Sequence, residues 1–313
     1  MASLIASGTA HVVGVADPGA EARREAARLA PEADVVVGLE ELLALEPDGV
    51  VIATPSALHA EQAIAILGLG AAVYCQKPLA RTGAETRRVL AAARAADRPL
   101  GVDLCYRHTD AVGGLRLALA GDGIGRVHSV DLAFHNAYGP DKAWFTQREL
   151  SGGGCLVDLG THLVDLGLWL TASTRAEIVS ARVLAGGEPV DPDGSAVEEF
   201  ATAEIDTDAG VRMRLACSWF LSAGRDCVFE CTLYGTTGAV TMGNLDGSFY
   251  DFVAERWVGT RTERLSAPGE DWGARGITRW AARVADGTGF DADRARGLEL
   301  VADVLDRIYD AAR

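Results

Sequence analysis

The sequence predicts an α/β domain with a doubly wound parallel sheet, followed by an α+β domain built on a large, mostly antiparallel open sheet. In the first third of the chain, short apolar runs without alternation are separated by helical patterns, which is typical of parallel strands covered on both faces. After about residue 125 the segments are longer and several alternate apolar and polar residues, as strands do in a sheet with one open face. The chain of 313 residues has room for two domains of roughly 150 residues each. We place them at residues 1–107 and 108–313.

The first domain is predicted to alternate strands and helices. Its strands are expected at His11–Ala16, Asp34–Val37, Gly49–Ala53, Ala71–Cys75 and Leu100–Cys105. Its helices are expected at Ala20–Leu29, Glu40–Leu45, Leu58–Leu67 and Thr82–Ala96. Strands that alternate with helices in this way form parallel sheets.

The second domain is predicted to be mainly strands joined by turns, with the turn signals at Asp206–Gly210 and Gly235–Gly238. Its strands are expected at Val127–Phe134, Ile178–Leu184, Glu198–Ile205, Val211–Trp219, Cys227–Tyr234 and Ala239–Met242. Its helices are expected at Val157–Leu170, Trp272–Ala285 and Ala292–Ala311, and the last is expected to pack back on the first domain. Residues Glu188–Gly194 are expected to form a surface loop.

Charge and cysteine content exclude several classes of partner. The formal net charge of −15 disfavours nucleic acids and anionic membranes, which require clustered Lys and Arg. No apolar run approaches the roughly 20 residues that cross a bilayer, and Met1–Ala10 lacks the pattern of a signal peptide. The six cysteines contain no CxxC pair, which favours a reducing compartment over a disulfide or zinc framework. We therefore expect a cytoplasmic protein.

Three polar residues recur in the helix that follows Gly152-Gly153-Gly154. Asp158, His162 and Asp165 stand at i, i+4 and i+7 and therefore share one helix face. A carboxylate one turn from an imidazole can orient it as a general base, and the glycines would allow close approach of a ligand. The alternative is that Asp158 caps the helix and His162 is a hydrogen-bonded core histidine.

Further polar residues follow the predicted parallel strands, at the edge where doubly wound sheets bind ligands. Lys77 follows the strand that ends at Cys75, and in a cleft it could donate a proton or stabilise an alkoxide; the alternative is a solvated loop lysine. Thr54-Pro55 follows the preceding strand, with His59 one turn into the next helix. Asp17 ends the first predicted strand and could accept hydrogen bonds from an adenosine ribose, which favours NAD; the alternative is a helix cap.

Taken together, these motifs resemble the glucose–fructose oxidoreductase / inositol dehydrogenase superfamily (Gfo/Idh/MocA). The resemblance covers nearly the whole chain, in order. It consists of Val12-Val13-Gly14-Val15-Ala16-Asp17-Pro18, Ile52-Ala53-Thr54-Pro55 with His59, Gln76-Lys77-Pro78, Tyr106-Arg107, and Gly153-Gly154 through Asp158-Leu159-Gly160-Thr161-His162-Leu163-Val164-Asp165.

The resemblance implies a Rossmann domain and hydride transfer between NAD(P) and a secondary alcohol of a sugar, cyclitol or related polyol. It implies that Lys77 is the catalytic lysine that contacts both substrate and cofactor. His162 would be the general base, Asp158 its substrate-binding and orienting neighbour, and Arg107 a further substrate-binding residue.

The resemblance also implies the cofactor contacts. Thr54, Pro55 and His59 would lie against NAD, or NADP, and Gln76 near the nicotinamide ribose. The open sheet would form the interface of a homo-oligomer. Many members carry Glu where this chain has Gln76, so a negative charge beside Lys77 is missing.

The start of the chain departs from the family pattern. In a dinucleotide fold the ribose acid lies roughly 20 residues after a glycine-rich turn, which would place that turn ahead of residue 1. Met1–Ser7 corresponds to the end of the first helix, and Gly8, Gly14 and Gly19 do not form G-x-G-x-x-G. We therefore expect the natural protein to extend upstream by a strand and a turn; the alternative is a short form that has lost cofactor binding.

Removal of a central strand has a structural consequence. We expect either a gap between the strands at His11–Ala16 and Gly49–Ala53 or a direct, shifted pairing of the two.

Two other functions stay open. One is a cofactor-less binding or regulatory protein on the same scaffold. The other is a redox-neutral epimerase or glycosidase that holds NAD tightly. A metal site is not expected, since Asp158 and His162 have no third ligand at a recognisable spacing.

Overall fold

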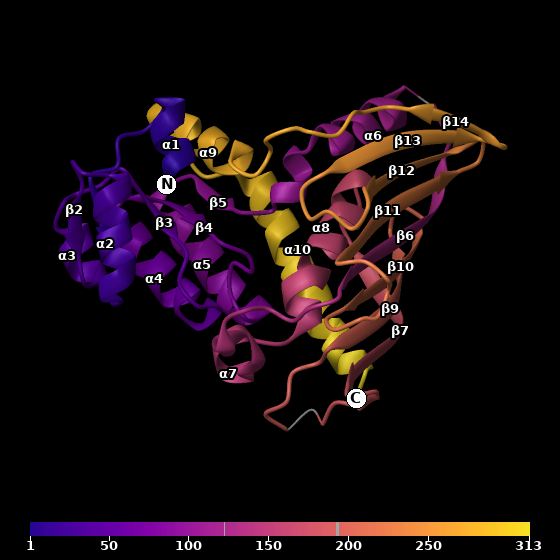
Figure 1. The fold of residues 1–313 in the computed structure, drawn as a ribbon, viewed down its shortest axis with the longest axis horizontal. Helices are drawn as coiled ribbons and strands as arrows, with labels where there is room; N and C mark the ends of the chain where they lie inside the picture. The colour runs from indigo at the N-terminus through magenta and orange to yellow at the C-terminus, as the bar shows by residue number, and fades with distance from the viewer. Residues whose placement is uncertain (122, 192–193) are drawn as a thin grey trace.

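The computed structural model describes residues 1–121, 123–191 and 194–313. Figure 1 shows a helix-rich N-terminal part beside a large twisted sheet. The fold class is confirmed: parallel strands with helices come first, and a mostly antiparallel sheet follows.

The N-terminal part contains the predicted alternation of strands and helices. Its strands are β1 (Gly14–Ala16), β2 (Asp34–Val36), β3 (Gly49–Ile52), β4 (Ala72–Cys75) and β5 (Leu100–Val102). Its helices are α1 (Ala2–Ser7), α2 (Ala20–Leu29), α3 (Leu39–Leu43), α4 (Ser56–Gly68) and α5 (Gly83–Ala96). Each strand lies within its predicted range, although β1 and β5 are each three residues shorter than predicted. All of the pairings among these strands are parallel.

These five strands form two separate sheets, one of β1 and β2 and one of β3, β4 and β5. Within the described residues no ladder joins β1 to β3, so the expected interruption between them takes the form of a gap. Val13 beside β1 and Val51 in β3 are both exposed. β1 and β3 are therefore less buried than β4, in which all four residues are buried.

Helix α9 (Arg275–Ala285) packs on the sheet of β3–β5. It begins three residues later than predicted, and its Trp280 ring lies 5.6 Å from that of Tyr74. Gly49 makes this approach possible, because a Cβ there would come within 2.7 Å of the Trp280 ring.

The C-terminal part forms one sheet of nine strands, in the order β14-β13-β12-β11-β6-β10-β9-β7-β8. They are β6 (Val127–Asn136), β7 (Ala176–Ala185), β8 (Glu188–Pro189), β9 (Phe200–Thr207), β10 (Arg212–Ser218), β11 (Cys227–Gly235), β12 (Ala239–Asn244), β13 (Phe252–Val258) and β14 (Arg261–Arg264). Of these pairings only β6–β10 is parallel. The loop predicted at Glu188–Gly194 begins with β8, and residues 192 and 193 of it lie outside the described residues.

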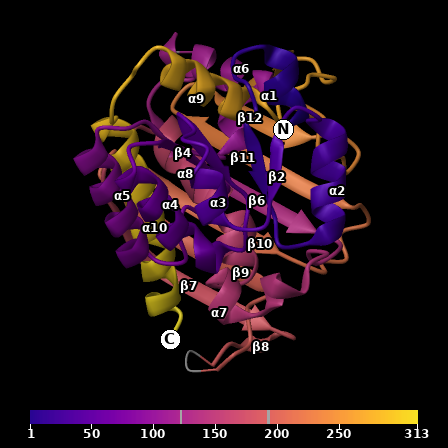
Figure 2. The same ribbon diagram turned by 90° about the vertical axis from the view of Figure 1, so that its left-hand side faces the viewer.

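Helices α6 (Asp110–Ala120), α8 (Thr161–Leu170) and α10 (Ala292–Ala311) lie on the side of this sheet that faces the N-terminal part (Figures 1 and 2). The burial of β9 alternates from residue to residue, as expected when one face is covered and the other is open. On the open face, Arg214 of β10 forms an ion pair with Asp131 of β6.

Helix α10 contacts both halves of the molecule. It packs on α8 and β7 of the second part and on α5 of the first. Asp306 of α10 accepts a hydrogen bond from the Gly83 N–H at the start of α5, at 2.8 Å. The position of α10 therefore depends on both parts of the chain.

Candidate active site

Lys77 and Asp158 form the centre of the site. Lys77 follows β4, and its Nζ donates to the backbone oxygen of Asp158 at 2.8 Å and pairs with the Asp158 Oδ1. The second carboxylate oxygen, Oδ2, accepts a hydrogen bond from the indole Nε1 of Trp219 at 3.1 Å. The Asp158 carboxylate is therefore held by two donors from different segments of the chain.

Asp158 lies in a π-helical turn, Leu156–Gly160, that precedes α8. The sequence predicts one continuous α-helix from Val157 to Leu170, and the wider turn changes the face on which Asp158 lies. Such turns are frequent at functional sites. No hydrogen bond joins Asp158 to His162 within the described residues, so the expected contact between them is not formed and Asp158 is directed to Lys77 instead.

His162 is buried, with an exposed fraction of 5%. Its ring packs edge-on against Tyr106, with ring centroids 4.8 Å apart. Neither ring nitrogen has a hydrogen-bond partner in the described ranges of the chain, which does not fit the alternative of a hydrogen-bonded core histidine. Burial lowers the pKa of His162 well below its ordinary value, and the nearby charge of Lys77 lowers this pKa further. The imidazole is therefore neutral at pH 7.

Asp165, the third residue of the predicted face, pairs with Arg107 rather than with His162. The Arg107 Nε donates to the Asp165 Oδ2 at 2.7 Å, and its Nη2 binds the other oxygen. Burial raises the pKa of Asp165, while Arg107 acts in the opposite direction. The guanidinium also lies over the ring of Trp169, at 4.8 Å. Arg107, which the sequence places among the substrate-binding residues, is thus occupied by structural contacts.

His59 connects the turns that follow β3 and β4. Its Nδ1 lies 2.7 Å from the carbonyl oxygen of Pro78, and its Nε2 lies 2.7 Å from that of Thr54. Burial lowers the pKa of His59, and the two carbonyls oppose this shift. Both ring nitrogens are engaged by the backbone and connect the two turns, so neither nitrogen is available to hydrogen-bond to a cofactor. Pro55 precedes α4 as its N-cap.

Gln76 and Asp17 also have local partners. The Gln76 Nε2 donates to Asp103 at 2.7 Å, and the same carboxylate accepts the hydroxyl of Tyr74 at 2.8 Å. The Asp17 Oδ1 accepts the Gly19 N–H at 2.7 Å. Gly19 is the N-cap of α2, so this bond resembles the helix cap that the sequence offers as the alternative role of Asp17. The Asp17 Oδ2 has no hydrogen-bond partner among the residues described.

The sequence did not identify the aromatic side chains at this site. The space beside Lys77 and Asp158 is lined by Trp144 and Phe145 and has a volume of about 10 Å³. These two rings are stacked with centroids 3.9 Å apart, and Phe145 lies edge-on to Trp219 at 6.5 Å. Trp219 ends a predicted strand, which was the only sequence signal for its position.

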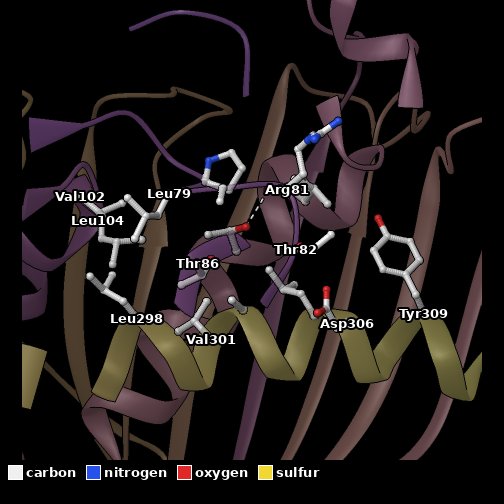
Figure 3. A pocket seen from close by; sticks show the side chains of 16 residues that line it. Leu79, Arg81, Thr82, Thr86, Val102, Leu104, Leu298, Val301, Asp306 and Tyr309 are labelled. Atoms are coloured by element: carbon white, nitrogen blue, oxygen red, sulfur yellow. Dashed lines mark hydrogen bonds between the residues drawn. The ribbon is translucent and has the colours of Figure 1, made fainter. Parts of the chain in front are cut away.

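A second cavity, of about 40 Å³, lies between the turn after Pro78, α5 and α10 (Figure 3). Apolar residues such as Leu79, Val102 and Val301 form most of its wall. Its volume corresponds to a few water molecules, which is less space than a sugar ring needs.

None of the described helices is long and apolar enough to span a membrane. No group of three or more His, Cys, Asp or Glu in the described ranges could hold a metal ion.

Two family models match the chain. Residues 1–104 match an oxidoreductase family with an NAD-binding Rossmann fold, and residues 114–241 match the GFO/IDH/MocA C-terminal domain. Together the two matches cover most of the chain.

Individual proteins show the same likeness. The 1,5-anhydro-D-fructose reductase of Ensifer adhaerens is 34% identical over 238 residues, which are 75% of this chain and 66% of that protein. The dTDP-3,4-didehydro-2,6-dideoxy-alpha-D-glucose 3-reductase of Saccharopolyspora spinosa is 27% identical over 296 residues, 92% of this chain and 83% of that protein. The matched region spans less than two thirds of the length of the curated relatives that are 34% identical. A solved 3-ketoreductase from Actinomadura kijaniata, in complex with NADP and TDP-benzene, has the same fold, with a TM-score of 0.82 at 21% identity over 97% of this chain and 90% of that one.

Proposed function

We propose, because the chain belongs to the GFO/IDH/MocA family of oxidoreductases, that it transfers a hydride between NAD(P) and a secondary alcohol of a sugar, cyclitol or related polyol. One observation carries the proposal: a lysine held by an aspartate lies at the carboxyl end of a parallel strand, close to a buried histidine with no hydrogen-bond partner among the described residues. The names of the two relatives above, both reductases of sugar derivatives, support the substrate class.

His162 is suited to accept the proton of the substrate hydroxyl. Because its pKa is lowered by burial and by Lys77, the imidazole is unprotonated at neutral pH and can act as a general base. Removal of this proton from the hydroxyl leaves negative charge on the oxygen as the carbon–hydrogen bond breaks.

Lys77 is suited to stabilise that oxygen. Its ammonium carries three N–H donors, and two of them are used by the backbone oxygen and the carboxylate of Asp158. The third donor has no partner among the described residues, so it can face the substrate oxygen and stabilise developing negative charge. Asp158 fixes the direction of this donor, and Trp219 fixes Asp158.

The residues at the carboxyl ends of β1, β3 and β4 fit a dinucleotide. The open Oδ2 of Asp17 offers an acceptor for ribose hydroxyls, Thr54 and Pro55 would line the cofactor, and Gln76 and Lys77 would lie near the nicotinamide. When bound, NAD(P) supplies the acceptor or donor of the hydride. His59 would support this site indirectly, through the carbonyls of Thr54 and Pro78.

A substrate that binds in the space beside Lys77 and Asp158 would require movement of the aromatic pair. A space of about 10 Å³ has room for one water molecule at most, whereas a sugar ring is many times larger. We expect the segment that carries Trp144 and Phe145 to move aside when substrate binds. The rings would then offer an apolar wall to the substrate.

Three further features belong to this proposal. Residues 1–107 would bind the dinucleotide, and residues 108–313 would bind substrate and form a homo-oligomer through the open face of the nine-stranded sheet. The free thiols of all six cysteines support a reducing, cytoplasmic location. Sedimentation analysis of the purified protein tests the oligomer, since a monomer at micromolar concentration would exclude it.

The experiment is a panel of sugars, cyclitols and polyols with NAD and NADP, followed by nicotinamide absorbance. We expect activity with at least one cyclic sugar derivative and a loss on the order of 10²–10⁴-fold in Lys77→Ala and His162→Ala. Lys142→Ala and His128→Ala, which change exposed residues of the same types, are the controls. Wild-type rates in either site variant would remove that residue from the mechanism.

A further inference from the structure

Glu198 is a buried carboxylate outside the catalytic cluster. It lies just before β9, and 2% of its surface is exposed. Its hydrogen-bond partners are backbone N–H groups and a tyrosine hydroxyl, and none of the described Lys or Arg side chains pairs with it. A buried charge without a cation is costly, so its contacts require an explanation.

These contacts all converge on the start of the π-helical turn. The Glu198 Oε1 accepts the N–H groups of Gly154 and Leu156, each at 2.9 Å. The backbone oxygen of Glu198 accepts the N–H of Cys155 at 3.0 Å. Three consecutive N–H groups at the beginning of a helical segment, which have no partner within the segment itself, are thus satisfied by one distant residue.

Helix α10 adds the fourth donor. The hydroxyl of Tyr309 donates to the same Oε1 of Glu198 at 2.7 Å. Figure 3 shows Tyr309 extending from α10 with its hydroxyl turned away from the helix. The guanidinium of Arg148, in α7 (Arg148–Ser151), lies over the Tyr309 ring at 5.9 Å.

This arrangement explains the glycines that the sequence analysis singled out. A Cβ at Gly154 would lie 2.0 Å from the backbone oxygen of Glu198, and a Cβ at Gly153 would lie 2.1 Å from the hydroxyl of Tyr309. In this structure the space left by these glycines is filled by Glu198 and Tyr309, and it is not open to a ligand.

Asp158 follows this anchored turn directly. It lies two residues after Leu156, and both its backbone oxygen and its carboxylate hold Lys77. Any shift of the turn therefore moves the two groups that direct the lysine.

We propose that Glu198 is a positioning residue for the Asp158–Lys77 pair, and that Tyr309 supports it from α10. This inference rests on the proposed function, because it assigns Glu198 a role in the geometry of that site. Misplacement of a reacting group by about 1 Å can cost on the order of 10²-fold in rate.

Two variants test the proposal. Glu198→Gln keeps the size of the side chain but replaces the carboxylate by a neutral amide, whose oxygen is a weaker acceptor for the two N–H groups and the Tyr309 hydroxyl. Tyr309→Phe removes only the hydroxyl and keeps the ring under Arg148. The control is Glu199→Gln, because the Glu199 carboxylate lies beside the same strand and accepts the N–H of Gly186 at 3.3 Å, its one side-chain hydrogen bond among the described residues.

The first measurement does not depend on activity. The indole N–H of Trp219 donates to Asp158, so its resonance in a ¹H–¹⁵N spectrum, assigned with Trp219→Phe, reports the position of that carboxylate. We expect this resonance to shift in Glu198→Gln and Tyr309→Phe and to stay in place in Glu199→Gln. The second measurement is kcat, which should fall by roughly 10- to 100-fold in Glu198→Gln and less in Tyr309→Phe, with KM changed less than twofold.

The outcomes separate the two proposals. An unmoved Trp219 resonance in folded Glu198→Gln and Tyr309→Phe overturns the positioning role, whatever the activity. A shifted resonance in a protein that oxidises none of the panel substrates supports the positioning of Asp158 but counts against the proposed function. If Glu198→Gln does not fold, Tyr309→Phe decides the question alone, since it leaves the packing of the ring unchanged.

Discussion

The strength of the Lys77–Asp158 pair can be measured by a double-mutant cycle. Lys77→Met and Asp158→Asn each remove one charge, and Asn keeps an oxygen that can accept the Trp219 N–H. The two side chains are only 17% and 15% exposed, so water screens the pair poorly. Two unit charges about 4 Å apart attract by about 4 kcal/mol at an effective dielectric constant of about 20, and desolvation of both groups offsets part of this.

Each single variant leaves one charge partly buried without a partner. Loss of one member of a fully buried pair costs about 3–5 kcal/mol. Because this pair retains some contact with solvent, we expect a decrease of about 2–3 kcal/mol in the free energy of unfolding for each single variant. The double variant should be little worse than either, which corresponds to a coupling energy of about 2 kcal/mol.

The assay is urea unfolding of the four proteins at pH 7, followed by circular dichroism and analysed with a common slope. Effects that add within about 0.5 kcal/mol would show that the two residues are independent, and the reasoning about the centre of the site would then be refuted. The circular dichroism spectrum of each folded variant is the control for a change of structure.

Three other predictions concern His162, Asp17 and Trp219. His162 has a folded-state pKa below its unfolded value, so below about pH 6.5 the unfolded chain binds more protons than the folded one. The free energy of unfolding of the wild type should therefore fall by up to about 1.4 kcal/mol per pH unit as the pH decreases from there towards the folded pKa. His162→Phe should lack this contribution. Urea unfolding between pH 7 and pH 5 measures it, and identical slopes in the two proteins would contradict the shift. Asp17→Ala should weaken a preference for NAD over NADP, seen as the ratio of kcat/KM values; a wild-type preference for NADP would mean that Asp17 serves only the turn at Gly19. Trp219→Phe removes one donor from Asp158 and should lower kcat by about tenfold, in line with about 1.5 kcal/mol for a hydrogen bond to a charged group, and an unchanged kcat would show that Lys77 alone holds the carboxylate.

Much of the fold could be predicted from local sequence patterns. The helices Ala20–Leu29 and Ala292–Ala311 begin and end at the predicted residues. Helix α6 was missed because its sequence contains Gly113 and Gly114, which have low helix propensity. The buried face of α6 needs a small residue at position 114, since a Cβ at Gly114 would lie 3.0 Å from the Leu265 Cβ.

Strand β14 was missed for a different reason. All four of its residues, Arg261–Arg264, are polar and exposed, so no apolar pattern marks it. The pairing of this strand with β13 supplies the hydrogen bonds, and such pairing is not visible in a local window of sequence.

At the site, the residue types could be predicted but their contacts could not. Lys77 and Asp158 were each identified, yet their ion pair joins positions that are 81 residues apart. The π-helical turn leaves no mark in the spacing of apolar residues, so Asp158 was expected to face His162. The sequence pattern places Glu198 in a strand and gives no sign of its contacts, because only the fold brings its carboxylate to the Gly154 N–H.

The transfer of a hydride from substrate carbon to nicotinamide is the central claim, and isotope labelling tests it most directly. The measurement uses the best substrate of the panel with deuterium on the carbon that bears the reacting hydroxyl, and mass spectrometry of the nicotinamide after turnover. The account predicts that one deuterium appears in the reduced nicotinamide, and that Lys77→Ala and His162→Ala slow its appearance by the same factor as product formation. Product formed by the wild-type protein without any deuterium on the nicotinamide would contradict the account.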